Sequence, residues 1–251
     1  MTETKPGGVW DTIKTVLYAV LIALGIRTAA FEPFNIPSGS MIPTLLIGDY
    51  LFVSKFSYGY SRHSLPLSLP LISERLMYTP PERGDVAVFK LPSDNKTDYI
   101  KRLIGLPGDT IQVRRGRLYI NAKLVPRKRI EDFLVEEIPG RVQSVRQYIE
   151  TLPNGRTHRI LESSDRGPLD DTPVYKVPPG HFFAMGDNRD NSLDSRVPNS
   201  RGLHGVGFVP LENLVGRAEV MFFSTDGTAA WWEVWGWIQA TRLNRLFQSV
   251  D

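Results

Sequence analysis

The sequence predicts a mainly β protein, in which antiparallel sheets form a core with an inserted smaller β subdomain, plus an N-terminal transmembrane helix and a C-terminal helix. The 19 prolines and 21 glycines are spread along all 251 residues, which suits short strands and turns better than long helices. Short apolar runs separated by turn residues recur through most of the chain. One long apolar run lies near the N-terminus and a group of tryptophans near the C-terminus, and these predict the two helices.

The composition limits the classes of function. Hydrophobic residues make up 41% of the chain, which is enough for a sizeable core, and the length suits one domain with an inserted subdomain. The net charge is only +3 and no block of lysine and arginine dominates, so we expect no nucleic-acid partner. Cysteine is absent, which excludes disulfides, thiol nucleophiles and cysteine-based metal sites.

The apolar run near the N-terminus follows a polar tail of residues 1–12. Residues 13–31 span about 28 Å as a helix, enough for a transmembrane anchor if Lys14 and Arg27 reach the two headgroup layers. A cleavable signal peptide, with its site at residues 28–30, fits the same run and stays open at this point. Both alternatives export most of the chain, and lysines in the tail favour a cytoplasmic N-terminus.

The core is predicted in two parts, residues 32–125 and residues 172–226. In the first part a strand follows the turn at residues 47–49, and a nearly continuous apolar strand at residues 86–90 is expected to be buried. The other strands of both parts are expected at residues 99–104, 110–113, 118–121, 174–177, 181–185, 207–209, 215–220 and 221–224. The runs at 110–113 and 118–121 are expected to join as a hairpin.

Two segments differ from the core in composition. Residues 126–171 hold 17 charged residues in 46, against 23% for the whole chain, and predict an inserted charged subdomain that faces solvent. Residues 227–251 predict a Trp-rich C-terminal helix, with tryptophans at positions 231, 232, 235 and 237. Tryptophan with arginine favours a membrane–water interface, but packing of this helix on the sheet fits equally well.

Candidate chemistry begins at Ser38, Gly39 and Ser40, between Pro37 and Pro43. Proline fixes φ and donates no backbone hydrogen bond, so the two prolines hold this segment extended. Glycine lets the backbone turn, which can aim both serines at one point. A serine becomes a nucleophile only beside a base, and without one the segment is an ordinary loop.

Lys101 is the candidate base. In an extended strand Tyr99, Lys101 and Leu103 share one face, which places the amine between two apolar side chains. Burial disfavours the ammonium form, and a fall of roughly three units from a pKa of about 10.4 would let the lysine act near neutral pH. The alternative is an edge-strand lysine whose tip reaches solvent.

The histidines form no recognisable group. His63, His158, His181 and His204 are scattered and lack the spacing of a metal site, so we expect no metal and no cofactor. A Ser–His–Asp triad through His181 and Asp187 stays open as an alternative.

Three segments taken together reveal a family resemblance. They are Ser38, Gly39, Ser40 and Met41; then Tyr99, Ile100, Lys101 and Arg102; and then Gly186, Asp187, Asn188, Arg189, Asp190, Asn191 and Ser192. With these segments in this order, the chain resembles the bacterial type I signal peptidases (leader peptidases). The resemblance covers the N-terminal apolar run and residues 34–49, 83–109 and 186–218, and it transfers nothing to residues 126–171.

The resemblance implies a membrane-bound serine endopeptidase with a Ser–Lys dyad, which removes N-terminal signal peptides from exported preproteins. It implies a retained single-pass anchor in the cytoplasmic (inner) membrane, with the catalytic domain on the outer, periplasmic side. The implied partners are the phospholipid membrane and preproteins with small residues at positions −1 and −3. No cofactor is implied.

Position by position, the resemblance implies a nucleophile at Ser40 and a general base at Lys101. Ser38 matches the hydroxyl that joins the Ser40 backbone N–H in the oxyanion hole, and Ser192 matches the hydroxyl that orients the lysine. The charged residues that match supporting positions are Arg102, Asp187, Asp194 and Arg196. The residues that match the shallow substrate pockets are Phe34, Ile36, Pro37, Met41, Leu45, Tyr99 and Ile100.

Two other classes of function fit the same features. A self-cleaving Ser–Lys protease of the repressor type needs the same two side chains but no anchor. A membrane-tethered β module that only binds exported chains needs the anchor but no nucleophile.

Overall fold

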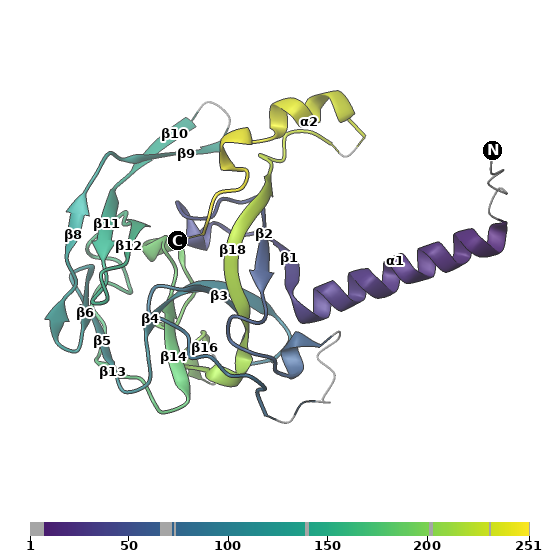
Figure 1. Cartoon of the computed structure of the whole chain (residues 1–251). Helices are drawn as coiled ribbons and strands as arrows, with labels where there is room; N and C mark the ends of the chain where they lie inside the picture. Colours follow the sequence, from purple (N-terminus) through teal and green to yellow (C-terminus); the bar gives the residue numbers. More distant parts are fainter. Residues whose placement is uncertain are drawn as a thin grey trace.

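The computed structural model describes residues 8–65, 72, 74–138, 141–200, 203–230 and 232–250. A β-rich body carries one long helix, which projects away from it at the N-terminal end (Figure 1). Lys5 of the expected tail and Trp231 of the C-terminal group lie outside the described residues.

A seven-stranded antiparallel sheet forms the centre of the body, in the order β1-β2-β18-β3-β4-β14-β17. Its strands come from both predicted parts of the core, which confirms the expected antiparallel β architecture. In chain order they are β1 (Phe31–Asn35), β2 (Asp49–Ser54), β3 (Val86–Lys90), β4 (Asp98–Gly105), β14 (His181–Met185), β17 (Val209–Pro210) and β18 (Leu214–Ser224).

Strand β3 lies inside the sheet, between β18 and β4, and is buried on both faces. Val86 and Val88 belong to one hydrophobic cluster, and Ala87 and Phe89 belong to a second. Burial on both faces is the physical reason for the nearly continuous apolar run at residues 86–90, so that prediction is confirmed.

Smaller sheets pack beside the main one. The order β13-β5-β6-β7 makes a four-stranded sheet, β12-β11-β8 a three-stranded sheet, and β9 with β10 and β15 with β16 make two-stranded sheets. The bounds are β5 (Thr110–Arg114), β6 (Arg117–Ile120), β7 (Lys123–Leu124), β8 (Arg127–Arg129), β9 (Phe133–Ile138), β10 (Arg141–Val145), β11 (Gln147–Thr151), β12 (Thr157–Leu161), β13 (Tyr175–Lys176), β15 (Asn199–Ser200) and β16 (Leu203–His204).

The hairpin predicted at residues 110–121 is β5 and β6, joined by Arg115 and Gly116. Both turn residues have positive φ, 47° and 67°, as a two-residue hairpin turn requires. Ile111 and Ile120 face each other across the hairpin and bury their side chains in a third hydrophobic cluster.

Helix α1 (Val9–Ala29) coincides with most of the expected anchor, but its limits differ from residues 13–31. It begins within the expected tail, and Phe31 is already the first residue of β1. Pairing with β2 satisfies the backbone groups of residues 31–35, so these residues join the sheet instead of extending the helix. Within the part of the chain that the structure describes, no helix is both long and apolar enough to cross a membrane.

The expected C-terminal helix of residues 227–251 is too long, because only α2 (Val234–Ala240) is α-helical. Beyond α2 the chain packs against the main sheet. Met221 in β18 accepts a hydrogen bond from the Phe247 N–H at 2.7 Å, and Val250 is buried in the same cluster as Val86. The chain after α2 therefore pairs with the sheet and does not continue the helix, because packing on the sheet buries apolar side chains such as Val250.

Candidate active site

Ser40 lies in the short 3₁₀ helix η1 (Gly39–Met41), just after the extended segment at Pro37 and Ser38. Ile36, Met41 and Leu45 all insert into the hydrophobic cluster beneath this segment. These three anchors fix the backbone on both sides of Ser40, whose own side chain keeps only 8% of its surface exposed. The loop is therefore held in place by packing although its sequence is rich in serine, glycine and proline.

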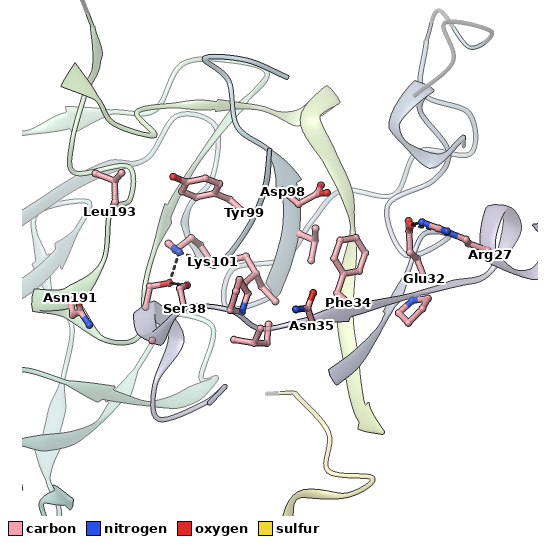
Figure 2. Close-up of a pocket in the computed structure, with 17 residues that line it drawn as sticks. Arg27, Glu32, Phe34, Asn35, Ser38, Asp98, Tyr99, Lys101, Asn191 and Leu193 are labelled. Atoms are coloured by element: carbon pink, nitrogen blue, oxygen red, sulfur yellow. Dashed lines mark hydrogen bonds and ion pairs between the residues drawn. The ribbon is translucent and has the colours of Figure 1, made fainter. Parts of the chain in front are cut away.

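Lys101 extends from β4 toward Ser40, and only 4% of its surface is exposed. Its Nζ lies 2.7 Å from Ser40 Oγ and 3.0 Å from the Ile100 carbonyl oxygen (Figure 2). The amine also lies 5.3 Å from the centre of the Tyr99 ring. The two residues that the sequence singled out as possible nucleophile and base are thus in direct contact, and the prediction that Lys101 is buried is confirmed.

Burial lowers the pKa of Lys101 from 10.5 to about 8, because the ammonium form loses its hydration. The charges of Asp194 and Asp187 act in the opposite direction and raise the pKa. Burial is the larger effect, so a substantial neutral fraction exists near pH 8.

Two further hydroxyls lie close to this pair. Ser38 Oγ is 3.5 Å from Ser40 Oγ. The Ser192 side chain is buried, and its hydroxyl has no hydrogen-bond partner among the described residues. Ser192 and the Ser40 carbonyl both press against Gly186, where an added Cβ would collide with each of them. Gly186 therefore permits the close approach of the segment after β14 to η1.

Two buried ion pairs contribute charges that act on Lys101. Arg102 donates to both oxygens of Asp187, at 2.9 and 2.8 Å, and Arg196 donates to both oxygens of Asp194, each at 2.9 Å. Burial alone would raise the pKa of each carboxyl, but the arginine partners more than offset it and leave both pKa values lowered. Both carboxylates are therefore ionised at neutral pH and hold rigid charges near Lys101.

A cavity of about 690 Å³ opens beside Ser40 and Lys101. Eight of its lining residues were assigned a role in the site from the sequence: Phe34, Ile36, Pro37, Ser38, Ser40, Tyr99, Ile100 and Lys101. Met41 and Leu45 do not line it, since both are fully buried in the cluster below. The sequence missed Asn35, Asp98, Asn191 and Leu193, and also Arg27 and Glu32, which line the cavity where α1 meets β1 (Figure 2).

Sequence reasoning also missed residues that position Ser40. The Asn188 N–H donates to the Ser40 carbonyl at 3.1 Å, and its side-chain amide donates to the Gly39 carbonyl at 3.0 Å. The Thr44 hydroxyl donates to Asp187. The many polar residues at 186–196 could have indicated that Asn188 belongs to the site, whereas nothing in the sequence around Thr44 indicates its contact with Asp187.

The charged insert contributes buried residues to this region, which corrects the expectation that it faces solvent. Glu150 in β11 receives two hydrogen bonds from Arg189, and His158 in β12 lies 3.4 Å from Glu150. Leu161 in β12 donates its N–H to the Asp187 carbonyl at 2.9 Å. The high charge of residues 126–171 therefore reflects in part buried pairs that join the insert to the core.

The arrangement does not favour a triad through His181. Its Nδ1 lies 2.9 Å from the Pro179 carbonyl oxygen, and His181 does not line the cavity. The histidine that approaches Asp187 is His158, at 4.0 Å, and burial lowers its pKa.

Comparison with known proteins identifies the family. The family described as "Signal peptidase, peptidase S26" matches residues 9–223. The chain belongs to this family. Signal peptidase I of Rickettsia canadensis is 42% identical and covers 94% of this chain and 92% of its own length. That of Rickettsia conorii is 41% identical and covers 93% and 90%.

The signal peptidase family removes signal peptides, and the protein is accordingly an enzyme, a serine protease of the signal peptidase I type. The family resemblance read from three short segments is confirmed, and the alternative of a module that only binds exported chains is wrong. A crystal structure of a signal peptidase I from Enterococcus faecalis is 26% identical and covers 55% of this chain and 97% of its own, with a TM-score of 0.31, too low to support a conclusion about the fold.

The contact of Gly186 with Ser192 and Ser40 generates a prediction. In Gly186→Ala the new Cβ must displace the Ser40 carbonyl or Ser192. Because displacement of reacting groups by about 1 Å can lower a rate roughly a hundredfold, we expect kcat/KM on a signal-peptide substrate to fall by about that factor. Gly25→Ala in α1 is the matched control, since its Cβ meets no atom within 4 Å. Near-wild-type cleavage by Gly186→Ala would contradict this account.

Proposed function

We propose that Ser40 is the nucleophile and Lys101 the general base of a signal peptidase that uses a Ser–Lys dyad. The observation that carries the proposal is the 2.7 Å separation of Lys101 Nζ and Ser40 Oγ, with both side chains buried. A base must lie within hydrogen-bond reach of the proton it removes, and this pair meets that requirement without any movement.

In the proposed reaction the neutral Lys101 amine accepts the Ser40 proton while Oγ attacks the scissile carbonyl. The resulting ammonium then donates the proton to the leaving amine, which departs and leaves an acyl ester on Ser40. A water molecule, activated by the same amine, hydrolyses the ester and restores both groups. One lysine thus performs the proton transfers that histidine performs in other serine proteases.

The proposal assigns the oxyanion hole to the Ser40 N–H and the Ser38 hydroxyl, whose Oγ lies 3.5 Å from Ser40 Oγ. Each fixed donor of this kind is typically worth about 3–4 kcal/mol in the transition state. Ser192, whose buried hydroxyl lacks a partner, is assigned to orienting Lys101. The ion pairs Arg102–Asp187 and Arg196–Asp194 hold the surrounding backbone.

We assign substrate binding to the apolar side of the cavity, which accepts preproteins with small residues at positions −1 and −3. Phe34, Ile36, Pro37, Tyr99 and Ile100 line it and distinguish small from large side chains mainly by steric exclusion. Met41 and Leu45 have a supporting part in this proposal, because their burial fixes the cavity floor.

We further propose that α1 attaches the enzyme to the cytoplasmic membrane, with the catalytic body on the outer side. Large apolar side chains are exposed along α1, among them Trp10, Val16, Leu17, Leu21 and Ile22. Arg27, at the end of this helix, also lines the catalytic cavity. A preprotein held in the same membrane would thus meet the cavity at a raised effective concentration. In the proposed organisation residues 32–125 and 172–226 together form one catalytic core, which carries the insert at 126–171 and the Trp-rich tail at 227–251.

Removal of either dyad side chain tests the mechanism. We expect Ser40→Ala and Lys101→Met to abolish cleavage of an Ala-x-Ala preprotein in detergent, because each removes one partner of the proton transfer. The matched control for the lysine is Lys123→Met, at an exposed lysine on β7 that does not line the cavity. Cleavage is measured by the appearance of the mature protein, and folding by near-ultraviolet circular dichroism. Turnover by a folded Ser40→Ala or Lys101→Met variant would refute the dyad.

The pH dependence tests the protonation state. Because burial lowers the pKa of Lys101 to about 8, the neutral fraction rises from about a tenth at pH 7 to about nine tenths at pH 9. We expect kcat/KM to rise with pH over this range and to level off above it. Activity that falls between pH 7 and pH 9, while the protein stays folded, would contradict a neutral lysine base.

Membrane attachment is tested by extraction. We expect the full chain to stay with the lipid after an alkaline carbonate wash, and a variant that lacks residues 1–29 to be released. Protease added outside spheroplasts should digest the catalytic body if it lies on the outer side. Release of the full chain by carbonate, or protection of the body, would overturn the corresponding part of the proposal.

A further inference from the structure

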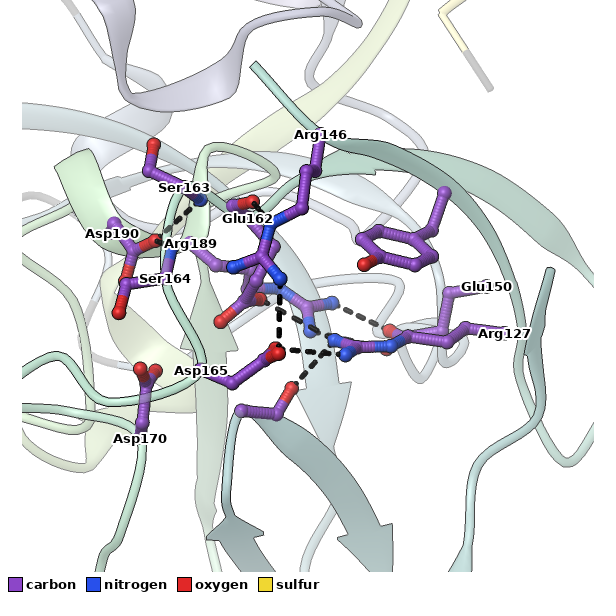
Figure 3. Close-up of polar contacts among 12 residues, drawn as sticks. Arg127, Arg146, Glu150, Glu162, Ser163, Ser164, Asp165, Asp170, Arg189 and Asp190 are labelled. Atoms are coloured by element: carbon purple, nitrogen blue, oxygen red, sulfur yellow. Dashed lines mark hydrogen bonds and ion pairs between the residues drawn. The ribbon is translucent and has the colours of Figure 1, made fainter. Parts of the chain in front are cut away.

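Three carboxylates meet where the charged insert joins the segment after β14. They are Glu162, which follows β12, Asp170, and Asp190 in the 3₁₀ helix η4 (Arg189–Asn191) (Figure 3). One oxygen from each lies within 4.8 Å of the others. Like charges this close repel one another unless a cation or a proton lies between them.

Protein donors satisfy these carboxylates on one side only. Asp190 Oδ2 accepts from the backbone N–H groups of Ser163 and Ser164, at 2.6 and 2.9 Å, and Asp170 Oδ2 accepts from the Gly167 N–H. The Glu162 carboxylate accepts no hydrogen bond from the described residues, and the guanidinium of Arg127 lies 3.6 Å from its Oε2.

The remaining oxygens of Glu162 and Asp170 are buried and unpaired. Each residue exposes only 1% of its surface, and within the described part of the chain neither Glu162 Oε1 nor Asp170 Oδ1 has a hydrogen-bond partner. Buried carboxylate oxygens in native proteins almost always have a partner, so each such atom calls for an explanation. Both unpaired oxygens belong to residues of the converging group, so the cluster contains buried carboxylates that lack part of their hydrogen bonding.

The nearby arginines are engaged elsewhere. Arg127 donates to the Gly116 carbonyl at 2.7 Å and to Asp165 at 3.1 Å. Arg146 donates to Asp165 at 3.0 Å, and Arg189 donates to both oxygens of Glu150. Among the described residues, Arg127 therefore faces Glu162 only at ion-pair distance, and no arginine donates a hydrogen bond to the three carboxylates.

Glycines make room for these oxygens. An added Cβ at Gly116 would lie 2.8 Å from Glu162 Oε1, and one at Gly167 would lie 3.0 Å from Asp190 Oδ1. Glu162 Oε1 and Asp190 Oδ1 therefore lie close to the backbone of these glycines, in space that a larger residue at either position would fill.

We propose that Glu162, Asp170 and Asp190 bind a hard divalent cation of the size of Ca²⁺. Calcium takes carboxylate oxygens at about 2.3–2.6 Å, so two ligands on opposite sides lie up to about 5 Å apart, and oxygens that all lie within 4.8 Å of one another can reach one such ion. Calcium also tolerates irregular geometry better than magnesium does. Asp190 is exposed, so the ion enters from that side, and water completes its coordination.

The bound ion has a consequence for the catalytic region, since it joins two segments that are distant in sequence. Glu162 and Asp170 belong to the insert, whereas Asp190 immediately precedes Asn191, which lines the catalytic cavity. The ion therefore fastens η4 to the insert and stiffens one wall of the cavity. The inference stands apart from the Ser–Lys mechanism, because binding and thermal stability report on it without catalysis.

The test uses the full chain in a non-ionic detergent, stripped with EDTA and titrated with calcium chloride. We expect one bound ion by isothermal calorimetry, and a rise of about 5–10 °C in Tm at about a hundredfold excess over the dissociation constant. Glu162→Gln and Asp190→Asn should each weaken calcium binding about tenfold or more, since even outer residues of metal sites have effects of that size.

The matched control is Asp132→Asn, which removes one carboxylate from the same insert at a partly exposed position paired with Arg129. We expect it to bind calcium as the wild type does. Should Glu162→Gln fail to fold, Asp190→Asn decides, because its side chain is exposed. The proposal is overturned if calcium leaves the Tm of the wild type unchanged, or if the variants at 162 and 190 respond to calcium as fully as Asp132→Asn.

Discussion

The structure depends on one constraint, which is that Lys101 is buried away from water and in contact with Ser40. An ammonium group strongly prefers hydration, and burial of Lys101 is opposed by that preference. The sheet enforces the burial, because Lys101 lies on β4 between Tyr99 and Leu103 and cannot turn away without disturbing the strand pairing with β3. The cost appears as a lowered pKa, which is the property that a lysine base requires.

The surroundings of this pair show how opposing charges are balanced. Asp187 and Asp194 raise the pKa of Lys101, yet each is tied by two hydrogen bonds to its own arginine. Ionised carboxylates held in this way order the backbone of the segment after β14. Because Asp187 and Asp194 are each paired with an arginine, they favour the ammonium form of Lys101 less strongly. The two carboxylates therefore order the backbone, and burial still lowers the pKa of Lys101.

The insert is part of this balance. Glu150 and His158 reach into the core beside Arg189, and the Leu161 N–H bonds to the Asp187 carbonyl. The charged character of residues 126–171 therefore has two origins, a solvated surface and a set of buried pairs. Their geometry links the insert to the loop that carries Ser192, and the proposed cation site lies on the same boundary.

The sequence by itself determined the antiparallel β architecture, the buried strand at 86–90 and the hairpin at 110–121, because these follow from side-chain alternation and turn residues that act over a few positions. It also supplied Ser40, Lys101 and part of the cavity lining, through three short motifs that resemble those of a known family. Only the tertiary structure decided which carboxylates pair with which arginines, that Glu150, His158 and Glu162 are buried, and that Met41 and Leu45 pack below the cavity. It also limited the two terminal helices to Val9–Ala29 and Val234–Ala240. Burial and pairing depend on segments far apart in the chain, and a local pattern carries no information about which distant segment will cover it.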